Sequence, residues 1–230
     1  MTVELTSVIC SGPGFKYPPC NALCFPIWNG DNLRTPCECY QVALDKCKSD
    51  ILVYSHDDVT IHDENWLERV VKLFENPRCV VVGFGGATRL GHPDLYKKPY
   101  KIQDMARGGY ASNQTDAETH GSRFTGDRRV AVLDAFFMAV RVDWLRRMGG
   151  WPVNDISHHC LDLWLGCMAA RDEKEVWATG IDCTHHGGGA STNKIYADAS
   201  WLQGGSLESD HQAPHLWLFR NFSDVLPLQI

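Results

Sequence analysis

The chain has 230 residues, of which 44% are hydrophobic and 22% charged, and its formal net charge is -6 at pH 7. This length suits one α/β domain with a full core, and the composition excludes a chain that is mainly disordered. The negative charge argues against a protein whose whole surface binds nucleic acid. No apolar run approaches the ~20 residues that span a bilayer. Since the amino terminus also lacks the pattern of a signal peptide, we expect a soluble, cytoplasmic protein.

The ten cysteines do not form the pattern of a secreted disulfide framework. Half of them lie in apolar runs typical of strands and helices, where free thiols pack as small hydrophobic groups. These are Cys10, Cys79, Cys160, Cys167 and Cys183. The others are concentrated in one early segment, at Cys20, Cys24, Cys37, Cys39 and Cys47. Their spacing differs from the paired spacing of ordinary zinc sites, so zinc is the minor alternative there.

Two short strands are predicted near the amino terminus, at residues 4–10 and 25–28. The first ends in Ser11-Gly12-Pro13-Gly14, which is glycine-rich but lacks the spacing of a P-loop or a dinucleotide fingerprint. Thr35-Pro36-Cys37-Glu38 then forms a capping box with proline at the first helical position, so a helix is predicted to begin at Pro36.

The central stretch is residues 51–54, four apolar residues without polar alternation, followed by Ser55-His56-Asp57-Asp58. The apolar run predicts a strand buried on both faces, and ligands bind beyond the carboxyl ends of such strands. Adjacent carboxylates repel each other, and a divalent cation with oxygen ligands would offset that repulsion. A polar strand end that leads into the next helix, capped by Asp63, explains this stretch equally well.

A helix and a further buried strand are predicted next. Residues 66–74 have a helical apolar face that Asn76-Pro77 ends, and residues 80–84 form another buried strand, which together imply right-handed parallel crossovers. Residues 85–129 are rich in glycine, asparagine and threonine with scattered basic residues, which indicates a functional lid, a mobile loop or a solvated loop without substrate contact.

The second half of the chain carries two isolated carboxylates. Residues 130–141 are predicted to form one long strand that contains Asp134, a charge that is costly there unless it is partnered or faces a site. A short helix is expected around 144–148, and a longer one has Asp162 near its start. Residues 176–183 predict a final strand, which runs into His185-His186-Gly187-Gly188-Gly189, and the tail is loop and helix.

These motifs, in this order, resemble family-2-type glycosyltransferases with the GT-A fold, in the bacterial and phage branch whose metal motif begins with histidine. The resemblance covers about residues 36–191 and rests on 50–67, 133–141, 149–151, 158–163 and 185–189. It implies an α/β fold with a mostly parallel central sheet, flanking helices and an abbreviated nucleotide-binding half. The single domain 1–230 would comprise a nucleotide-sugar and metal half at 1–84, a loop or lid at 85–129, and an acceptor half with the tail at 130–230.

The resemblance also implies a nucleotide-diphospho-sugar donor, with a UDP-sugar expected first, and either Mn²⁺ or Mg²⁺. His56, Asp57 and Asp58 stand in the place of the family's metal triplet, with Asp58 as the direct ligand and the other two at the cofactor. His185, or its neighbour His186, would complete the metal site. Nucleotide contacts are expected from Cys10, Ser11 and Gly12.

The family's catalytic base is a carboxylate near the start of the late helix, and Asp162 occupies that segment here. Members often carry two acids two residues apart, and Cys160 takes one of those places. Either Asp162 is therefore the base, or the chain is catalytically impaired. Asp134 would face the acceptor or the donor sugar.

The favoured function is an inverting, metal-dependent transfer of a sugar to a hydroxyl acceptor. We rank glycans, polysaccharides and other small acceptors first, and hydroxymethylated bases of phage-type DNA a close second. Nucleotidyl transfer is disfavoured because the glycine- and lysine-bearing signature after the first strand is missing. A degenerate sugar- or nucleotide-binding module remains an alternative because of Cys160, and the sequence leaves the oligomeric state open.

Overall fold

The computed structural model describes residues 5–11, 24–28, 34–56, 58–91, 109, 111–115, 122–157, 159–186 and 207–230. Its main sheet contains seven strands: β1 (Leu5–Ser11), β2 (Cys24–Trp28), β3 (Ile51–Ser55), β5 (Cys79–Gly83), β10 (Asp127–Val130), β12 (Phe137–Arg141) and β13 (Glu175–Thr179). Their order across the sheet is β10-β13-β5-β12-β3-β1-β2.

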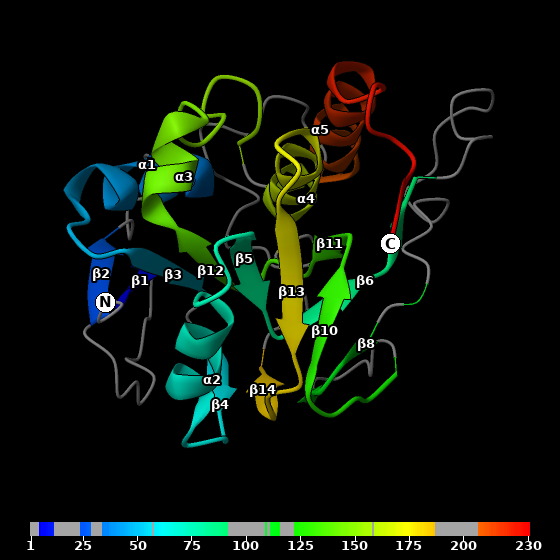
Figure 1. The fold of residues 1–230 in the computed structure, drawn as a ribbon. Helices are drawn as coiled ribbons and strands as arrows, with labels where there is room; N and C mark the ends of the chain where they lie inside the picture. The colour runs from blue at the N-terminus through cyan, green and yellow to red at the C-terminus, as the bar shows by residue number, and fades with distance from the viewer. Residues whose placement is uncertain are drawn as a thin grey trace.

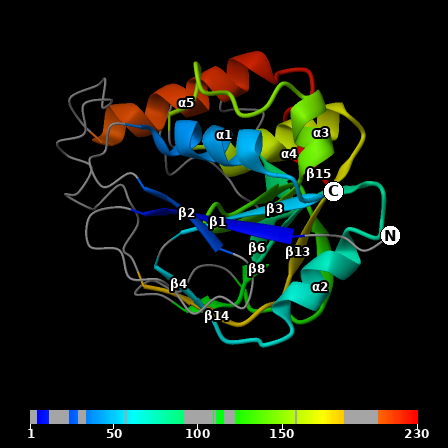
Figure 2. The same ribbon diagram turned by 90° about the vertical axis from the view of Figure 1, so that its left-hand side faces the viewer.

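The helices cover both faces of this sheet. They are α1 (Pro36–Lys46), α2 (Trp66–Leu73), α3 (Val142–Arg147), α4 (Leu161–Arg171) and α5 (Leu207–Asn221). Figure 1 and Figure 2 show α1, α3, α4 and α5 on one side and α2 on the other. Among the described residues, no helix is both long enough and apolar enough to cross a membrane.

The strands of the sheet run mostly in one direction, as predicted. β1 is parallel to β2 and β3, and β5 is parallel to β13, whereas β12 lies between β3 and β5 and is antiparallel to both. The edge strand β10 is also antiparallel to its neighbour β13. The sheet is therefore mixed, within the predicted α/β class.

Two hydrophobic cores lie on the two faces of the sheet. In β3, Leu52 and Tyr54 belong to the core beneath α1, α3, α4 and α5, whereas Ile51 and Val53 belong to the core beneath α2. This alternation follows from the two-residue period of a strand, and it explains why β3 is apolar at every position of its run. β3 is therefore buried along its whole length, up to Ser55 at its carboxyl end.

The predicted capping box of α1 is confirmed. Thr35 Oγ1 accepts a hydrogen bond of 3.1 Å from the Glu38 backbone N–H, and Glu38 Oε2 accepts one of 2.7 Å from the Thr35 N–H. The prediction that Asp63 caps the next helix is wrong. Asn65 is the N-cap of α2, and Asp63 Oδ1 instead accepts a bond of 2.9 Å from the Asn65 N–H while Asp63 Oδ2 pairs with Arg69 at 3.0 Å.

Two predicted strands are each divided in the structure. Residues 130–141 form the end of β10, then β11 (Val132–Leu133) and then β12, because β11 leaves the main sheet to pair with β6 (Gly85–Ala87). Asp134 therefore lies between strands, where its backbone N–H donates to Gly85 O at 3.0 Å. Residues 176–183 likewise divide between β13 and β14 (Cys183–His185), at a bend beside Gly180.

The glycine-rich segment 85–129 is not a continuous loop. Its described residues include β6, β7 (Arg89–Leu90), β8 (Ala111–Ser112), β9 (Gln114–Thr115) and β10. β7 pairs with β15 (Leu228–Gln229), and β14 pairs with β4 (Val59–Ile61) and β9. Of the basic residues scattered through this segment, Lys97, Lys98, Lys101 and Arg107 lie outside the described residues.

The described cysteine side chains are buried in the hydrophobic core, as expected. Cys37, Cys39 and Cys47 of the early segment are buried, and burial raises the pKa of Cys167 to about 12. No cysteine whose placement the structure describes joins a group of metal ligands. Cys20 lies outside the described residues, as does the side chain of Cys24.

Candidate metal and donor site

The site begins where β3 ends. Ser55 pairs with Phe137 of β12, so the next residue, His56, lies opposite Phe136. The His56 N–H donates to Phe136 O at 2.9 Å, which continues the strand pairing by one step. His56 is thus held just beyond the carboxyl end of β3, where ligands bind in open α/β folds.

A small second sheet brings the late histidines to the same place. β4 is antiparallel to β14, with Val59 paired to His185 and Thr60 to Thr184. The His186 N–H donates to Asp58 O at 2.8 Å just beyond this ladder. Because side chains alternate along a strand, His185 and His186 point to opposite faces.

Three side chains converge in consequence. His185 Nε2 lies 3.2 Å from His56 Nδ1 and 3.2 Å from Asp58 Oδ1, and His56 Nδ1 lies 4.0 Å from the same carboxylate oxygen. Within the described ranges, these three residues form the only group of histidine, cysteine or acidic side chains spaced to hold a metal ion.

Electrostatics keeps two of these groups in metal-binding form. Burial lowers the pKa of His56 and the neighbouring His185 lowers it further, although the charges of Asp58 and Asp134 act in the opposite sense. Burial alone raises the pKa of Asp58, but the close contact with His185 and the charge of His56 outweigh it, so this pKa lies below its usual value. At neutral pH His56 is therefore neutral and Asp58 ionised, as metal ligands must be.

The donor atoms fit a transition metal ion. Two metal–nitrogen bonds of about 2.1 Å at a right angle place their nitrogens about 3.0 Å apart. This is close to the 3.2 Å between His56 Nδ1 and His185 Nε2. Asp58 Oδ1 is buried and has no hydrogen bond of good geometry within the described part of the chain, so a cation would satisfy it. Two imidazoles and one carboxylate suit a first-row transition metal ion better than Mg²⁺, which prefers oxygen ligands.

The remaining predicted site residues, His186, Asp134 and Asp162, are not part of the three-residue group. His186 Nε2 is 2.9 Å from Thr60 Oγ1, on the other face of the β4–β14 pair from His185. Asp134 is half buried, and its charge acts on His56. Asp162 lies in the first turn of α4 and is only 3% exposed.

The expected nucleotide-contacting residues are only partly described. Cys10 and Ser11 are the last two residues of β1, which lies beside β3, so both are at the same edge of the sheet as His56. Gly12 and Asp57 lie outside the described residues. His56, predicted at the donor, lies in the metal-binding group instead. Phe136, whose carbonyl oxygen accepts the His56 N–H, was not predicted, because nothing in a run of apolar residues marks one of them as a partner of the site.

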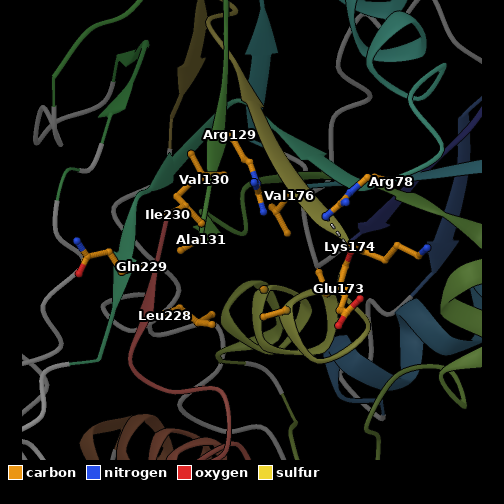
Figure 3. Close-up of a pocket in the computed structure, with 13 residues that line it drawn as sticks. Arg78, Arg129, Val130, Ala131, Glu173, Lys174, Val176, Leu228, Gln229 and Ile230 are labelled. Atoms are coloured by element: carbon orange, nitrogen blue, oxygen red, sulfur yellow. Dashed lines mark hydrogen bonds between the residues drawn. The ribbon is translucent and has the colours of Figure 1, made fainter.

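A hollow of about 210 Å³ lies elsewhere, between the end of α4, the start of β13 and β15 (Figure 3). Arg78 on its rim is engaged in ion pairing, with Nε 3.1 Å from Glu175 Oε1, and its Nη2 donates to Glu173 O at 3.3 Å. None of the predicted site residues lines this hollow. Arg78 thereby ties the segment before β5 to the start of β13, and the hollow is separate from the site described above.

Comparison with solved structures defines the class of fold as GT-A. Mannosyltransferase PcManGT from Pyrobaculum calidifontis, in complex with GDP-Man and Mn²⁺, is 12% identical with a TM-score of 0.50, over 80% of this chain and 57% of that one. GalNAc-T7 with UDP, GalNAc and Mn²⁺ is 7% identical with a TM-score of 0.52, over 86% of this chain and 47% of that one. The chain thus spans about half the length of these two glycosyltransferases.

The sequence gives the narrower assignment. The chain belongs to the glycosyltransferase-like family, whose model matches residues 21–162. A comparison with curated protein sequences finds no significant match. The matched residues include His56, Asp58 and Asp162, whereas His185 lies beyond them.

Proposed function

We propose that the protein is a metal-dependent, inverting glycosyltransferase that moves a sugar from a nucleoside-diphosphate sugar to a hydroxyl acceptor. The observation that carries this proposal is the convergence of His56, Asp58 and His185 beyond the carboxyl end of β3, in a chain of the glycosyltransferase-like family. Mn²⁺ is the ion we propose, since imidazole nitrogens favour transition metals and Mg²⁺ prefers oxygen.

His56, Asp58 and His185 would hold the ion, which when bound neutralises the donor diphosphate and the charge that grows on it as the sugar leaves. The two structural neighbours were each solved with Mn²⁺ and a nucleotide, which supports this chemistry. The end of β1, at Cys10 and Ser11, is the place we propose for the nucleotide, with a UDP-sugar as the first donor to test.

Asp162 is the base that we propose. It would take the proton from the acceptor hydroxyl as that oxygen forms its bond to the anomeric carbon, while the bond from that carbon to the diphosphate oxygen breaks on the opposite face. Asp134, half buried near His56, would face the sugar. A glycan or another small hydroxyl compound is the acceptor class that we propose, because a net charge of -6 disfavours a large polyanion.

Release of nucleoside diphosphate from a panel of nucleotide sugars with Mn²⁺ tests the proposal. Asp58→Asn and Asp162→Asn should each reduce the rate by about 100-fold or more, because one loses a ligand and the other the base. Only Asp58→Asn should also lose Mn²⁺ binding. Asp182→Asn is the matched control, since this exposed carboxylate lies next to β14 and pairs with Arg123 at 3.5 Å.

Turnover without any metal, or equal rates in Asp58→Asn and the wild type, would contradict the metal assignment. A wild type that binds donors and Mn²⁺ but releases no product with any acceptor would favour a binding module, in which Cys160 replaces a needed acid. Hydroxymethylated DNA belongs in the acceptor panel, and faster turnover with it than with glycans would overturn the acceptor class.

A further inference from the structure

Phe136 contacts both histidines of the candidate metal site. Its ring stacks on that of His185, with centroids 5.6 Å apart and planes inclined by 23°. Its carbonyl oxygen accepts the hydrogen bond from the His56 N–H. The side chain is fully buried, at 0% exposure, so its position is fixed by the surrounding core.

The two histidines need such a support. Rotation about the last side-chain bond of histidine is broad and only weakly restricted, so packing has to select the ring orientation that directs a nitrogen at an ion. The His56 and His185 ring centroids are 5.2 Å apart with planes inclined by 58°, and their nitrogens approach each other. The Phe136 ring lies against the face of the His185 ring. The Nε2 edge of His185 remains directed at Asp58.

We propose that Phe136 is a positioning residue, which sets the plane of His185 with its ring and the backbone of His56 with its carbonyl group, so that both nitrogens are prearranged for the metal. This inference rests on the proposed function. Residues that orient metal ligands usually do so by hydrogen bonds, and their loss weakens binding by about 10- to 100-fold. Replacing the ring leaves the carbonyl in place, so the lower end of that range applies.

Phe137 offers a matched control. It is 1% exposed, belongs to the same core and is the next residue along the chain. Its ring stacks on Phe84 at 3.7 Å and packs edge-on against Trp66 at 5.6 Å, on the other side of the strand from Met138. A leucine at position 136 or 137 therefore removes a similar buried ring, but only the first removes the face that His185 rests on.

The test is titration of the full chain with Mn²⁺, in which free Mn²⁺ is followed by electron paramagnetic resonance. Phe136→Leu should weaken Mn²⁺ affinity roughly tenfold and alter the visible absorption spectrum of the Co²⁺-loaded protein, whereas Phe137→Leu should leave both near those of the wild type. Thermal unfolding without metal checks that the two variants are folded and similarly destabilised. If Phe136→Leu does not fold, Phe136→Met replaces it, since methionine fills the volume without a flat face.

The outcomes separate this inference from the proposed function. If the wild type binds no Mn²⁺, both the proposed metal site and the proposed role of Phe136 are wrong. Wild type that binds Mn²⁺, with equal affinity in Phe136→Leu or equal losses in both leucine variants, would overturn the positioning role alone and leave the metal site intact.

Discussion

At the scale of single residues, Glu175 shows how burial and partners compete. It begins β13, its side chain is 13% exposed, and its carboxylate accepts hydrogen bonds from Asn76 at 2.9 Å and from Trp177 at 3.1 Å. Burial raises its pKa, but these two bonds and the charges of Arg129 and Arg78 outweigh burial, so the pKa is lowered from 4.5.

Because the pKa of Glu175 is lower in the folded than in the unfolded chain, its carboxylate stabilises the fold at a pH above the unfolded-state pKa. This contribution is lost as the pH falls through the folded-state pKa. Glu175→Gln should therefore lower the free energy of unfolding by about 1–2 kcal/mol at pH 7. The difference in the free energy of unfolding between Glu175→Gln and the wild type should become smaller as the pH falls below about 4.5. Urea unfolding at pH 7 and pH 4 checks this, and a gap that widens in acid would contradict it.

Gly166 of α4 lies where its surroundings leave no room for a side chain. A Cβ there would lie 2.4 Å from Ala131 O and 2.6 Å from Val132 Cγ1. Gly166→Ala should lower the free energy of unfolding by about 1–3 kcal/mol, although alanine favours a helix by about 1 kcal/mol. A variant that unfolds at higher urea concentration than the wild type would show that α4 can move away from β11.

At the scale of elements, the capping box of α1 has the clearest local cause. Thr35→Ala removes the side-chain acceptor for the Glu38 N–H and should cost about 1 kcal/mol, whereas Thr35→Ser keeps the hydroxyl and should cost far less. Chemical denaturation of the three proteins compares them directly. Equal losses in the alanine and serine variants would show that the methyl group of Thr35, rather than the hydrogen bond, is what matters.

The elements also show what can be predicted from a sequence. The strand at Ile51 and the helix at Pro36 were predictable because period and capping are local properties. The division of residues 130–141 was not, because apolar residues continue through Ala131 while the chain passes from one sheet to another. Likewise β4 and β14 are three residues long and only partly buried, so neither leaves a clear pattern.

At the scale of the whole molecule, the site is a product of tertiary structure. His56 and His185 are 129 positions apart, and only the pairing of β14 with β4 brings them together. The sequence indicated a cation near Asp58 because two adjacent carboxylates follow a buried strand. It did not indicate which of His185 and His186 faces that carboxylate, since this depends on the register of the β4–β14 pair.

We expect one metal ion to bind between these strands and a nucleotide sugar to bind beside it. The most direct measurement is anomalous diffraction at the manganese absorption edge from crystals grown with Mn²⁺ and a nucleotide sugar. We expect one strong peak within bonding distance of His56 Nδ1, Asp58 Oδ1 and His185 Nε2, with the donor diphosphate beside it. A peak elsewhere, or donor density beyond β3 with no metal beside it, would contradict the proposed metal site.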